Sequence, residues 1–190
     1  MPLPPGETVL LTLRLRGTLP VAVARDLSAR LTAAPVTCAT HHHVRKQLFG
    51  RFDAALDQRP VGPQHFECEK TATALAGELL LLEELGFVVH GFAILPNHAH
   101  AIVHLPARTG LSLAKALDQL HLRTEAACRR LVRPRLPAEA PFWQPGWHEV
   151  PLLDEAELGR AVAYLRQQPT RAGLPTRFQE WPYVDERVSG

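Results

Sequence analysis

Alternating apolar and polar residues mark the first expected strand, between residues 8 and 16. From Leu11 onward, leucines occupy every second position and Thr or Arg the positions between them, which is typical of a strand buried on one face. Two further apolar runs, 87–95 and 99–105, are separated by the turn-forming pair Pro96-Asn97. These runs predict an antiparallel hairpin.

Helical composition or spacing recurs in the first two thirds of the chain. A short helix is expected at 26–32, and an apolar stripe predicts another at 46–56. Residues 68–85 are rich in Ala, Leu and Glu and lack proline, so they predict a long helix that ends at Gly86. The segment 112–131 predicts a further helix, with leucines on one side and arginines mostly opposite.

The last expected helix has well-marked ends. Asp154 and Glu157 form the pattern of a capping box at its start, and Pro169 is expected to end it. Tyr164 and Gln168 are four residues apart, so they lie on one side of this helix, at the edge of its apolar stripe. The helix is therefore expected to deliver a phenol and an amide oxygen to one place on the sheet.

The order of these elements predicts the fold class. Strands and helices are mixed along the chain, with a short strand before the last helix, which favours an antiparallel sheet with helices on one face, an α+β sandwich. The 190 residues have the composition of one globular domain. No stretch of about 18 apolar residues and no basic leader before an apolar run is present, so a soluble, cytoplasmic protein is expected.

The cysteines are sparse and scattered. Cys38, Cys68 and Cys128 form no Cys-x-x-Cys pair, so the sequence indicates neither a disulfide framework nor a cysteine zinc site. We expect them to be reduced and buried.

The net charge of +2 hides a strongly basic segment. Between Pro106 and Leu136, seven Lys and Arg residues stand against two acidic ones, a local net charge of +5. Such a segment is compatible with binding to a phosphate backbone, although a solvated helix face explains it equally well. The sequence alone leaves both interpretations open.

His98 and His100 are the candidate metal ligands. Residues two apart on a strand point to the same face, so these imidazoles converge while Ala99 and Ala101 point to the opposite face. Neutral imidazole is the commonest metal ligand, and the alternative is a pair of half-exposed strand histidines. His104 has the same phase but lies about 13 Å from His98 along an extended strand, too far to share an ion. A structural or DNA-facing role is expected for it.

Another histidine run, His41-His42-His43, lies in the least legible part of the chain. Three consecutive histidines cannot share one face of a strand. A polar loop is therefore expected there in preference to a metal site.

Three blocks of sequence together resemble a known family. They are Leu95-Pro-Asn-His-Ala-His100, Phe142-Trp-Gln-Pro-Gly-Trp-His-Glu149 and the helical segment Tyr164-Leu-Arg-Gln-Gln-Pro-Thr-Arg-Ala-Gly173. The combination is similar to the single-tyrosine HUH transposases, especially the REP-associated tyrosine transposases, and the similarity covers residues 87–183. It implies a ferredoxin-like version of the antiparallel sheet with helices packed on it.

The resemblance implies an endonuclease and strand transferase that cuts and joins single-stranded DNA. Tyr164 would be the nucleophile, forming a 5′-phosphotyrosine link and releasing a 3′-hydroxyl. His98 and His100 would hold a divalent metal, with the carbonyl oxygen of Gln168 as a third ligand. Imidazoles favour Mn²⁺ and cellular abundance favours Mg²⁺, so either ion is expected.

The implied partner is DNA that folds into an imperfect hairpin, with the cleavage site in the flanking single strand. The arginines expected to contact it are Arg14, Arg16, Arg123, Arg129, Arg130, Arg133, Arg166 and Arg171. Trp143, Trp147 and Trp181 are candidates for stacking on bases, with core packing expected for at least two of them. No membrane partner is expected, and the protein is expected to be a monomer or a homodimer.

Two positions depart from the family pattern. The family commonly has Asn where this chain has Gln168, and either side chain offers a carbonyl oxygen. An acidic residue followed by His usually comes after the Trp-Gln block, whereas here His148 precedes Glu149, which leaves the role of that histidine open. Residues 35–67 are expected to be a family-variable insertion, and 173–190 a tail that packs on the single catalytic domain.

Two other functions remain open from the sequence. A domesticated relative would bind hairpin DNA without transposing it, and phosphotyrosine trapping distinguishes the two. A generic metal hydrolase that uses His98 and His100 would turn over without a covalent link and would survive Tyr164→Phe.

Overall fold

A computed structural model describes residues 6–19, 22–23, 25–26, 29, 38–58, 62–108, 110–133 and 135–187. For residues 38–42 and 58 it describes the backbone alone. Most of the short helix expected at 26–32 lies outside these residues.

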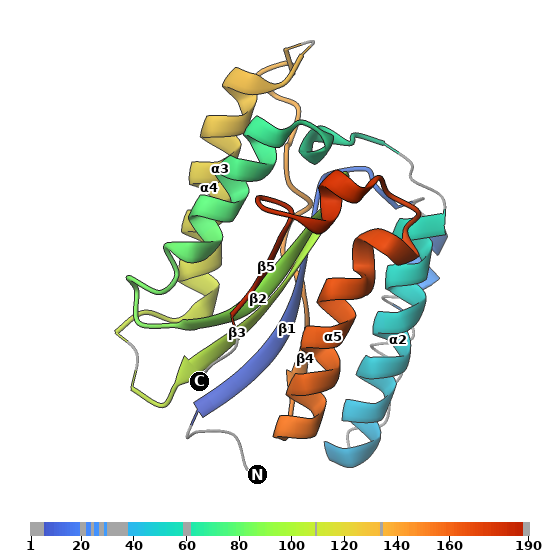
Figure 1. Ribbon diagram of the computed structural model, residues 1–190, viewed down its shortest axis with the longest axis vertical. Coiled ribbons are helices and arrows are strands. Elements are labelled where there is room, and N and C mark those ends of the chain that lie inside the picture. The colour runs from blue at the N-terminus through green and yellow to red at the C-terminus, as the bar shows by residue number, and fades with distance from the viewer. Residues whose placement is uncertain are drawn as a thin grey trace.

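The described strands form one five-stranded antiparallel sheet in the order β4-β1-β3-β2-β5 (Figure 1). Their bounds are β1 (Gly6–Arg14), β2 (Val88–Leu95), β3 (His98–Pro106), β4 (His148–Leu152) and β5 (Val184–Glu186). The expected N-terminal strand and the expected hairpin are confirmed, and only Pro96 and Asn97 lie in the hairpin turn. His98 begins β3, so the candidate ligands lie at the turn end of a central strand.

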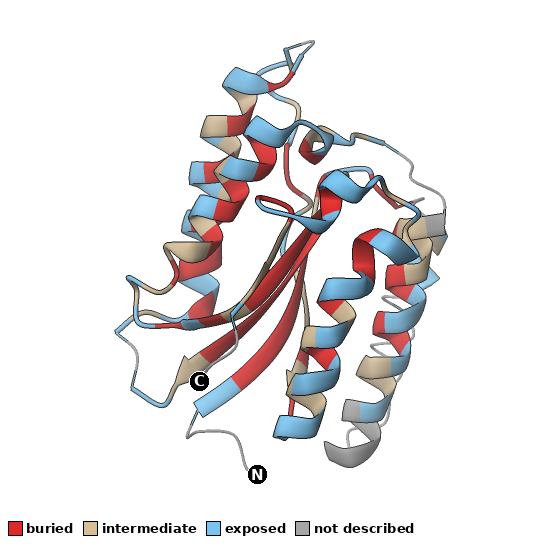
Figure 2. Ribbon diagram, viewed as in Figure 1, coloured by how far each residue is buried: buried red, intermediate tan, exposed pale blue. Residues whose placement is uncertain are grey.

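Helices cover both faces of the sheet (Figures 1 and 2), with α3 and α4 on one face and α2 and α5 on the other. Their bounds are α2 (Cys38–Gln58), α3 (Glu69–Leu80), α4 (Leu113–Leu131) and α5 (Glu155–Arg171), with a 3₁₀ helix η1 (His65–Glu67) before α3. The α+β class is confirmed, but the expectation of helices on one face only is wrong. Neighbouring strand residues such as Leu10 and Leu11 are both buried and point to opposite faces, so both faces need cover. None of the described helices is long and apolar enough to cross a membrane.

The two faces carry separate hydrophobic cores. The core under α3 and α4 includes Leu11 and Leu13 of β1 and Leu120 of α4. The core under α2 and α5 is smaller and joins Leu10 of β1 to Leu165 of α5. Its sheet surface is interrupted by buried polar side chains of the central strands, namely Thr8, Thr12, His98, His100 and His104. Because burial of polar groups is costly unless they are partnered, this face is the candidate for function.

The helix expected at 46–56 is confirmed, but α2 is longer and begins at Cys38. The backbone of His41-His42-His43 is therefore helical, and the expectation of a loop there is wrong. Histidine is a modest helix former, so the sequence gives little local signal for this extension. Tertiary packing stabilises it, since Leu48 and Phe52 on the same helix are buried.

Two other helix ends also differ from expectation. α3 ends at Leu80, and turns over 81–86 lead into β2, so Gly86, at φ +89°, ends the turns instead of capping the helix. α5 continues past Pro169 to Arg171. A proline lacks only its own N–H, and residues after it still donate backwards, as Ala172 does to the carbonyl oxygen of Gln168.

The C-terminal segment returns to the sheet. After α5, a 3₁₀ helix η2 (Thr176–Gln179) buries Phe178, and β5 pairs with β2. Tyr183 packs on Phe178, with ring centroids 4.4 Å apart, and its hydroxyl donates to the carbonyl oxygen of Glu67 at 3.1 Å. This tyrosine therefore belongs to the core under α3 and α4.

The cysteines differ from one another in exposure. Cys128 is buried, and burial raises the pKa of its thiol to about 12. Cys68 is exposed, contrary to expectation, because it precedes the first turn of α3 at the surface. Both of these thiols are free, and the side chain of Cys38 lies outside the described residues.

Two leucines of α4 provide a test of the larger core. Leu120 is fully buried, whereas Leu122 is 71% exposed. Leu120→Ala is expected to lower the free energy of unfolding by about 2–5 kcal/mol, because it removes buried apolar atoms and leaves a cavity. Leu122→Ala is expected to change it by less than about 0.5 kcal/mol. Urea unfolding followed by circular dichroism measures both, and equal losses would contradict the assigned orientation of α4.

Candidate metal centre and tyrosine

His98 and His100 lie side by side on β3, fully buried on the face that α2 and α5 cover. Their Nε2 atoms are 3.2 Å apart. Pairing with β1 on one side and β2 on the other fixes the backbone of both residues, so a rigid sheet sets the positions of the rings. The alternative of two half-exposed strand histidines is wrong.

The Nδ1 atom of each histidine lies against an oxygen. His98 Nδ1 is 2.7 Å from Asn97 Oδ1, and His100 Nδ1 is 3.0 Å from Thr12 Oγ1. Asn97 is itself buried, and its Nδ2 donates to the carbonyl oxygen of Leu56 at 3.4 Å. The amide oxygen of Asn97 can only accept, which favours the His98 tautomer in which Nδ1 carries the proton and Nε2 is free to bind a cation. The Thr12 hydroxyl can donate or accept, so it orients the His100 ring in either tautomer.

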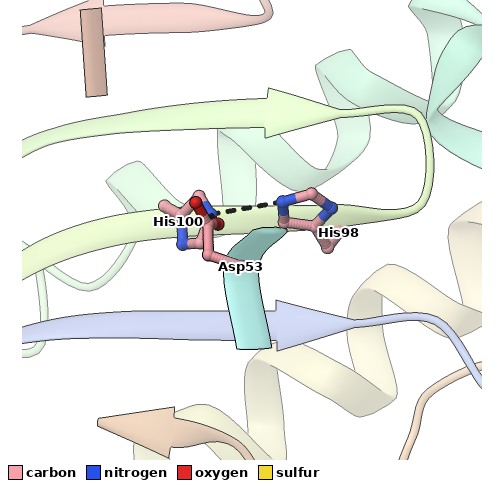
Figure 3. Close-up of side chains that lie close together, drawn as sticks. All are labelled: Asp53, His98 and His100. Atoms are coloured by element: carbon pink, nitrogen blue, oxygen red, sulfur yellow. Dashed lines mark hydrogen bonds and ion pairs between the residues drawn. The ribbon is translucent and has the colours of Figure 1, made fainter. Parts of the chain in front are cut away.

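A third candidate ligand, Asp53, reaches the two rings from α2 (Figure 3). Its Oδ1 is 2.8 Å from His100 Nε2, and the residue is 2% exposed. The donor atoms of Asp53, His98 and His100 all lie within 4.8 Å of one another. Two segments far apart in the chain thus form one buried cluster, which we call the metal cluster.

The sequence patterns did not identify Asp53, which lies 47 residues before His100. A local signal was nevertheless present. Asp53 follows Phe49 by one helical turn and lies next to Phe52, within the apolar stripe of α2. Because a charged group on a buried helix face needs a partner, an acid at such a position is a candidate ligand.

The charges of the metal cluster suit cation binding. Burial, and then the proximity of His100, lower the pKa of His98 to about 3, so this imidazole is neutral at pH 7. Burial opposes ionisation of Asp53, but the hydrogen bond and charge of His100 outweigh it and hold the carboxyl pKa below its usual range. The cluster therefore offers a carboxylate and a neutral imidazole at neutral pH.

The last helix, α5, brings Gln168 to the metal cluster. The side chain is fully buried, and its Nε2 donates to Asp53 Oδ2 at 3.3 Å. Its Oε1 has no hydrogen-bond partner among the described residues. Buried polar atoms are rarely left unpartnered, so this amide oxygen is available as a further ligand.

Tyr164 lies one turn before Gln168 on the same side of α5. Its ring centroid is 5.6 Å from that of His100 and 5.6 Å from that of Phe49. The hydroxyl is buried, and its polar neighbour is the carboxylate of Asp53. Burial, and then the negative charge of Asp53, raise the pKa of this phenol above its ordinary value, so it is protonated at neutral pH.

The donor set fits a divalent first-row cation. Ligand atoms at about 2.0–2.2 Å from such an ion lie about 3 Å from one another. The contacts of His100 Nε2 with Asp53 Oδ1 and His98 Nε2 measure 2.8 and 3.2 Å. Two imidazoles and a carboxylate suit Mn²⁺, and the unpartnered oxygen of Gln168 would extend the set.

Two other histidines share this sheet face but lie outside the metal cluster. His148 pairs with Thr12 across β1 and β4, and its ring stacks on Phe52 with centroids 5.4 Å apart. Burial lowers the pKa of His148 to about 4. His104 is buried with Nδ1 2.9 Å from Thr8 Oγ1, which agrees with the structural role expected for it, and a DNA-facing role stays a prediction.

One group of the arginines expected to contact DNA lies away from the metal cluster. These residues are on α4 or just after it, on the opposite face of the sheet: Arg123, Arg129, Arg130 and Arg133. Arg123 pairs with Glu78 at 2.7 Å, and Arg129 pairs with Glu125 at 2.6 Å. Their role in DNA binding stays a prediction.

The other expected arginines are Arg14, Arg16, Arg166 and Arg171. Two of them border the metal cluster. The guanidinium of Arg14 lies 5.6 Å from the ring centroid of Phe52, and that of Arg171 lies 5.4 Å from the ring centroid of Tyr164. Arg16 is exposed, and Arg166 is paired with Glu186 of β5.

The tryptophans divide between core and surface. Trp143 is buried, and its indole N–H donates to the carbonyl oxygen of His121 at 3.2 Å. Trp147 is half-buried against the same core, whereas Trp181 is 53% exposed. The expected core packing of at least two of them is confirmed.

Two threonines on β1 test whether the hydrogen bond at Nδ1 tunes the metal cluster. Thr12→Val is expected to weaken Mn²⁺ binding by about 10- to 100-fold, because His100 loses the oxygen that orients its ring. Thr8→Val removes the same kind of bond from His104, which lies outside the cluster, and is expected to leave Mn²⁺ affinity unchanged. Calorimetric titration measures both, and equal losses would mean that general damage to the strand is responsible.

Comparisons with known proteins place the fold. No protein-family model matches the chain, and no curated protein matches it. Among solved structures, the chain is similar to a REP-associated tyrosine transposase bound to a REP hairpin, with a TM-score of 0.52 and 15% sequence identity. The match covers 95% of this chain and 76% of that one. At this identity the likeness concerns the fold.

Proposed function

We propose that this protein is a metal-dependent endonuclease and strand transferase, a transposase, that acts on single-stranded DNA flanking a hairpin through a covalent 5′-phosphotyrosine intermediate. The observation that carries the proposal is the position of Tyr164. Its ring lies against His100, next to a buried cluster of two imidazoles and a carboxylate suited to a divalent cation. The polar neighbour of the Tyr164 hydroxyl is the Asp53 carboxylate of this same cluster, so the phenol faces the candidate ligands.

Two independent likenesses support this function. The three sequence blocks around His98, Trp143 and Tyr164 resemble the single-tyrosine HUH transposases. The fold is similar to that of a REP-associated tyrosine transposase whose solved structure holds a REP hairpin. Residues from two of these blocks, His98 and His100 on β3 and Tyr164 on α5, converge on one side of the sheet, as a shared chemical task would require. Trp143 of the remaining block packs in the core on the other side.

The proposed reaction exchanges one phosphate ester for another. The Tyr164 oxygen attacks phosphorus, the bond from phosphorus to the 3′-oxygen breaks, and the proton lost by the phenol is balanced by the one gained at the released 3′-hydroxyl. A divalent cation held by Asp53, His98 and His100 would supply electrostatic stabilisation of the charge that develops on the phosphate. Reversal with another 3′-hydroxyl joins two strands without a nucleotide cofactor.

The protein contributes positioning as well as the nucleophile. Strand pairing and the contacts from Asn97 and Thr12 orient the imidazoles. α5 holds Tyr164 and Gln168 in fixed relation to each other. Because the Tyr164 hydroxyl is buried, neighbouring side chains must move before a phosphate reaches it, and the Phe49 ring of α2 is one such neighbour.

DNA contact is proposed first for the cations that border this site. Arg14 and Arg171 lie over aromatic rings of the site, so they are close enough to bind phosphates that flank the scissile one. The arginines of α4 would contact DNA only if it continued around to the opposite face of the sheet.

The test is formation of a protein–DNA adduct. Purified protein is incubated with Mn²⁺ and labelled single-stranded DNA taken from the palindromes that flank its own gene, and the products are separated on a denaturing gel. The expected result is a slow-migrating adduct that is lost when EDTA is present. Cleavage without an adduct would mean a water-using nuclease, and binding without cleavage would favour the domesticated hairpin-binding protein.

A further inference from the structure

A small pocket lies beside the metal cluster, and its lining includes none of the candidate metal ligands. Its volume is about 80 Å³. Its walls come from the end of α2, the segment before η1, the hairpin turn and the end of α5, and the lining residues are Leu56, Asp57, Gln64, Leu95, Pro96, Asn97, Ala172 and Leu174. Apolar side chains form most of this lining, with three polar ones among them.

Each element that contributes to the metal cluster also contributes a wall of this pocket. Asp57 follows Asp53 by four residues on α2, Asn97 directly precedes His98, and Ala172 follows Gln168 by four residues. Four residues of helix span about 6 Å. A nucleotide that held its phosphate at the metal cluster would therefore bring a neighbouring base to the pocket.

The polar groups of the pocket differ in whether they already have hydrogen-bond partners. Asn97 is occupied, because its amide bonds to His98 and to the carbonyl oxygen of Leu56. Asp57 has unused accepting capacity, since its Oδ1 is buried without a hydrogen-bond partner in the described part of the chain. Burial, and then the charge of Asp53, raise the pKa of Asp57 to about 6, so it is a carboxylate at pH 8.

We propose that this pocket binds one base next to the scissile phosphate, and that Asp57 makes it selective for cytosine. The inference rests on the proposed function, because it supplies the sequence preference of the same site. A carboxylate accepts from the N4 amino group of cytosine. Thymine presents the O4 acceptor at that position, so the carboxylate disfavours it.

The size of the pocket separates pyrimidines from purines. Pockets that enclose whole small ligands are usually about 300–1,000 Å³. A space of about 80 Å³ suits part of a nucleotide, and a one-ring base better than a two-ring one. Leucines and Pro96 provide apolar contacts for the ring, while Gln64 offers an amide that can donate to the remaining acceptors of cytosine.

The test reads the bases on either side of the break. Wild-type protein with Mn²⁺ at pH 8 is incubated with single-stranded DNA in which a randomised stretch flanks a hairpin. A stretch of about 12 nucleotides is long enough to cover the single-stranded segment that the protein contacts. Both the tyrosine-linked and the released fragments are sequenced. We expect cytosine to exceed thymine about tenfold at one position next to the break. In Asp57→Ala the ratio of cytosine to thymine is expected to approach one, because the carboxylate that favours one base and disfavours the other is gone.

A second measurement does not depend on cleavage. Tyr164→Phe protein with Mn²⁺ is titrated with short thymidine strands that carry either one central cytidine or none, and binding is followed by fluorescence anisotropy. We expect the strand with cytidine to bind more tightly than the strand without it. We expect this difference to disappear when Asp57→Ala is combined with Tyr164→Phe. Asp57→Asn is expected to reduce the preference for cytosine over thymine, because an amide can also donate to O4 of thymine.

The outcomes separate this inference from the proposed function. Adducts without a cytosine preference, or with one that Asp57→Ala leaves intact, would overturn the pocket assignment and leave the tyrosine chemistry standing. Absence of adducts together with an Asp57-dependent cytosine preference in binding would overturn the chemistry and support the pocket. Absence of both would overturn both.

Discussion

Tyr164→Phe is expected to eliminate the covalent protein–DNA adduct, a loss of at least about 1,000-fold, because the substitution removes the attacking oxygen and nothing else. The protein should fold about as well as the wild type. The hydroxyl that it loses is buried beside the Asp53 carboxylate, so the desolvation cost that is relieved and the polar contact that is lost largely offset each other. Denaturing gels measure the adduct, and thermal unfolding measures stability.

Tyr183→Phe is the matched control, since Tyr164 and Tyr183 are the two tyrosines of the sequence. Tyr183 donates to the carbonyl oxygen of Glu67 in the opposite core, so its loss is expected to cost about 1 kcal/mol of stability. Adduct formation is expected to persist. Tyr164→Phe should thus lose activity and keep its stability, whereas Tyr183→Phe should lose stability and keep its activity. An adduct that survives Tyr164→Phe, or that disappears in Tyr183→Phe, would contradict the assignment of the nucleophile.

Asp53→Asn is expected to weaken Mn²⁺ binding by at least about 100-fold and to eliminate adduct formation with it. The substitution keeps the shape of the side chain but removes the negative charge that lies 2.8 Å from His100 Nε2. A site reduced to neutral imidazoles and amides attracts a divalent cation far less. Calorimetric titration gives the affinity, and the rise in melting temperature on adding Mn²⁺ gives an independent measure of it.

Two further variants make this result decisive. Asp118→Asn removes the same charge from an exposed position on α4 and is expected to leave Mn²⁺ affinity unchanged. Gln168→Ala is expected to reduce affinity less than Asp53→Asn, because a neutral amide oxygen is a weaker ligand than a carboxylate. A larger loss in Gln168→Ala would instead support the ligand set expected from the sequence, with Asp53 outside it.

The features of this protein that its sequence predicts correctly follow from the periodicity of side chains on strands and helices. His98 and His100 share a face because side chains alternate on any strand, and Tyr164 and Gln168 share a side because positions four apart coincide on any helix. Such relations are properties of the backbone and hold whatever surrounds it. The hairpin, the N-terminal strand and the helix that carries Tyr164 were therefore predictable, as was the α+β class.

Helix bounds were less predictable because packing competes with local preference. α2 includes a histidine run with little helical signal, since Phe49 packs in the core on the sheet while Leu48, Phe52 and Leu56 pack with Leu19. Pro169 did not end α5, because the residues after it still find acceptors within the helix. Tertiary packing outweighed a weak local preference in α2, and hydrogen bonds within the helix carried α5 past its proline.

The sequence by itself determined the N-terminal strand and the hairpin, the shared face of the two histidines and the side of the helix that presents the tyrosine and glutamine. Only the tertiary structure decided that β5 joins the sheet, that helices cover both of its faces and that Asp53 completes the metal cluster. The reason is distance along the chain. The contact between Asp53 and His100 spans 47 residues, and it depends on which face of the sheet α2 covers. That choice is made by the burial of apolar surface summed over the whole fold, which no local periodicity records.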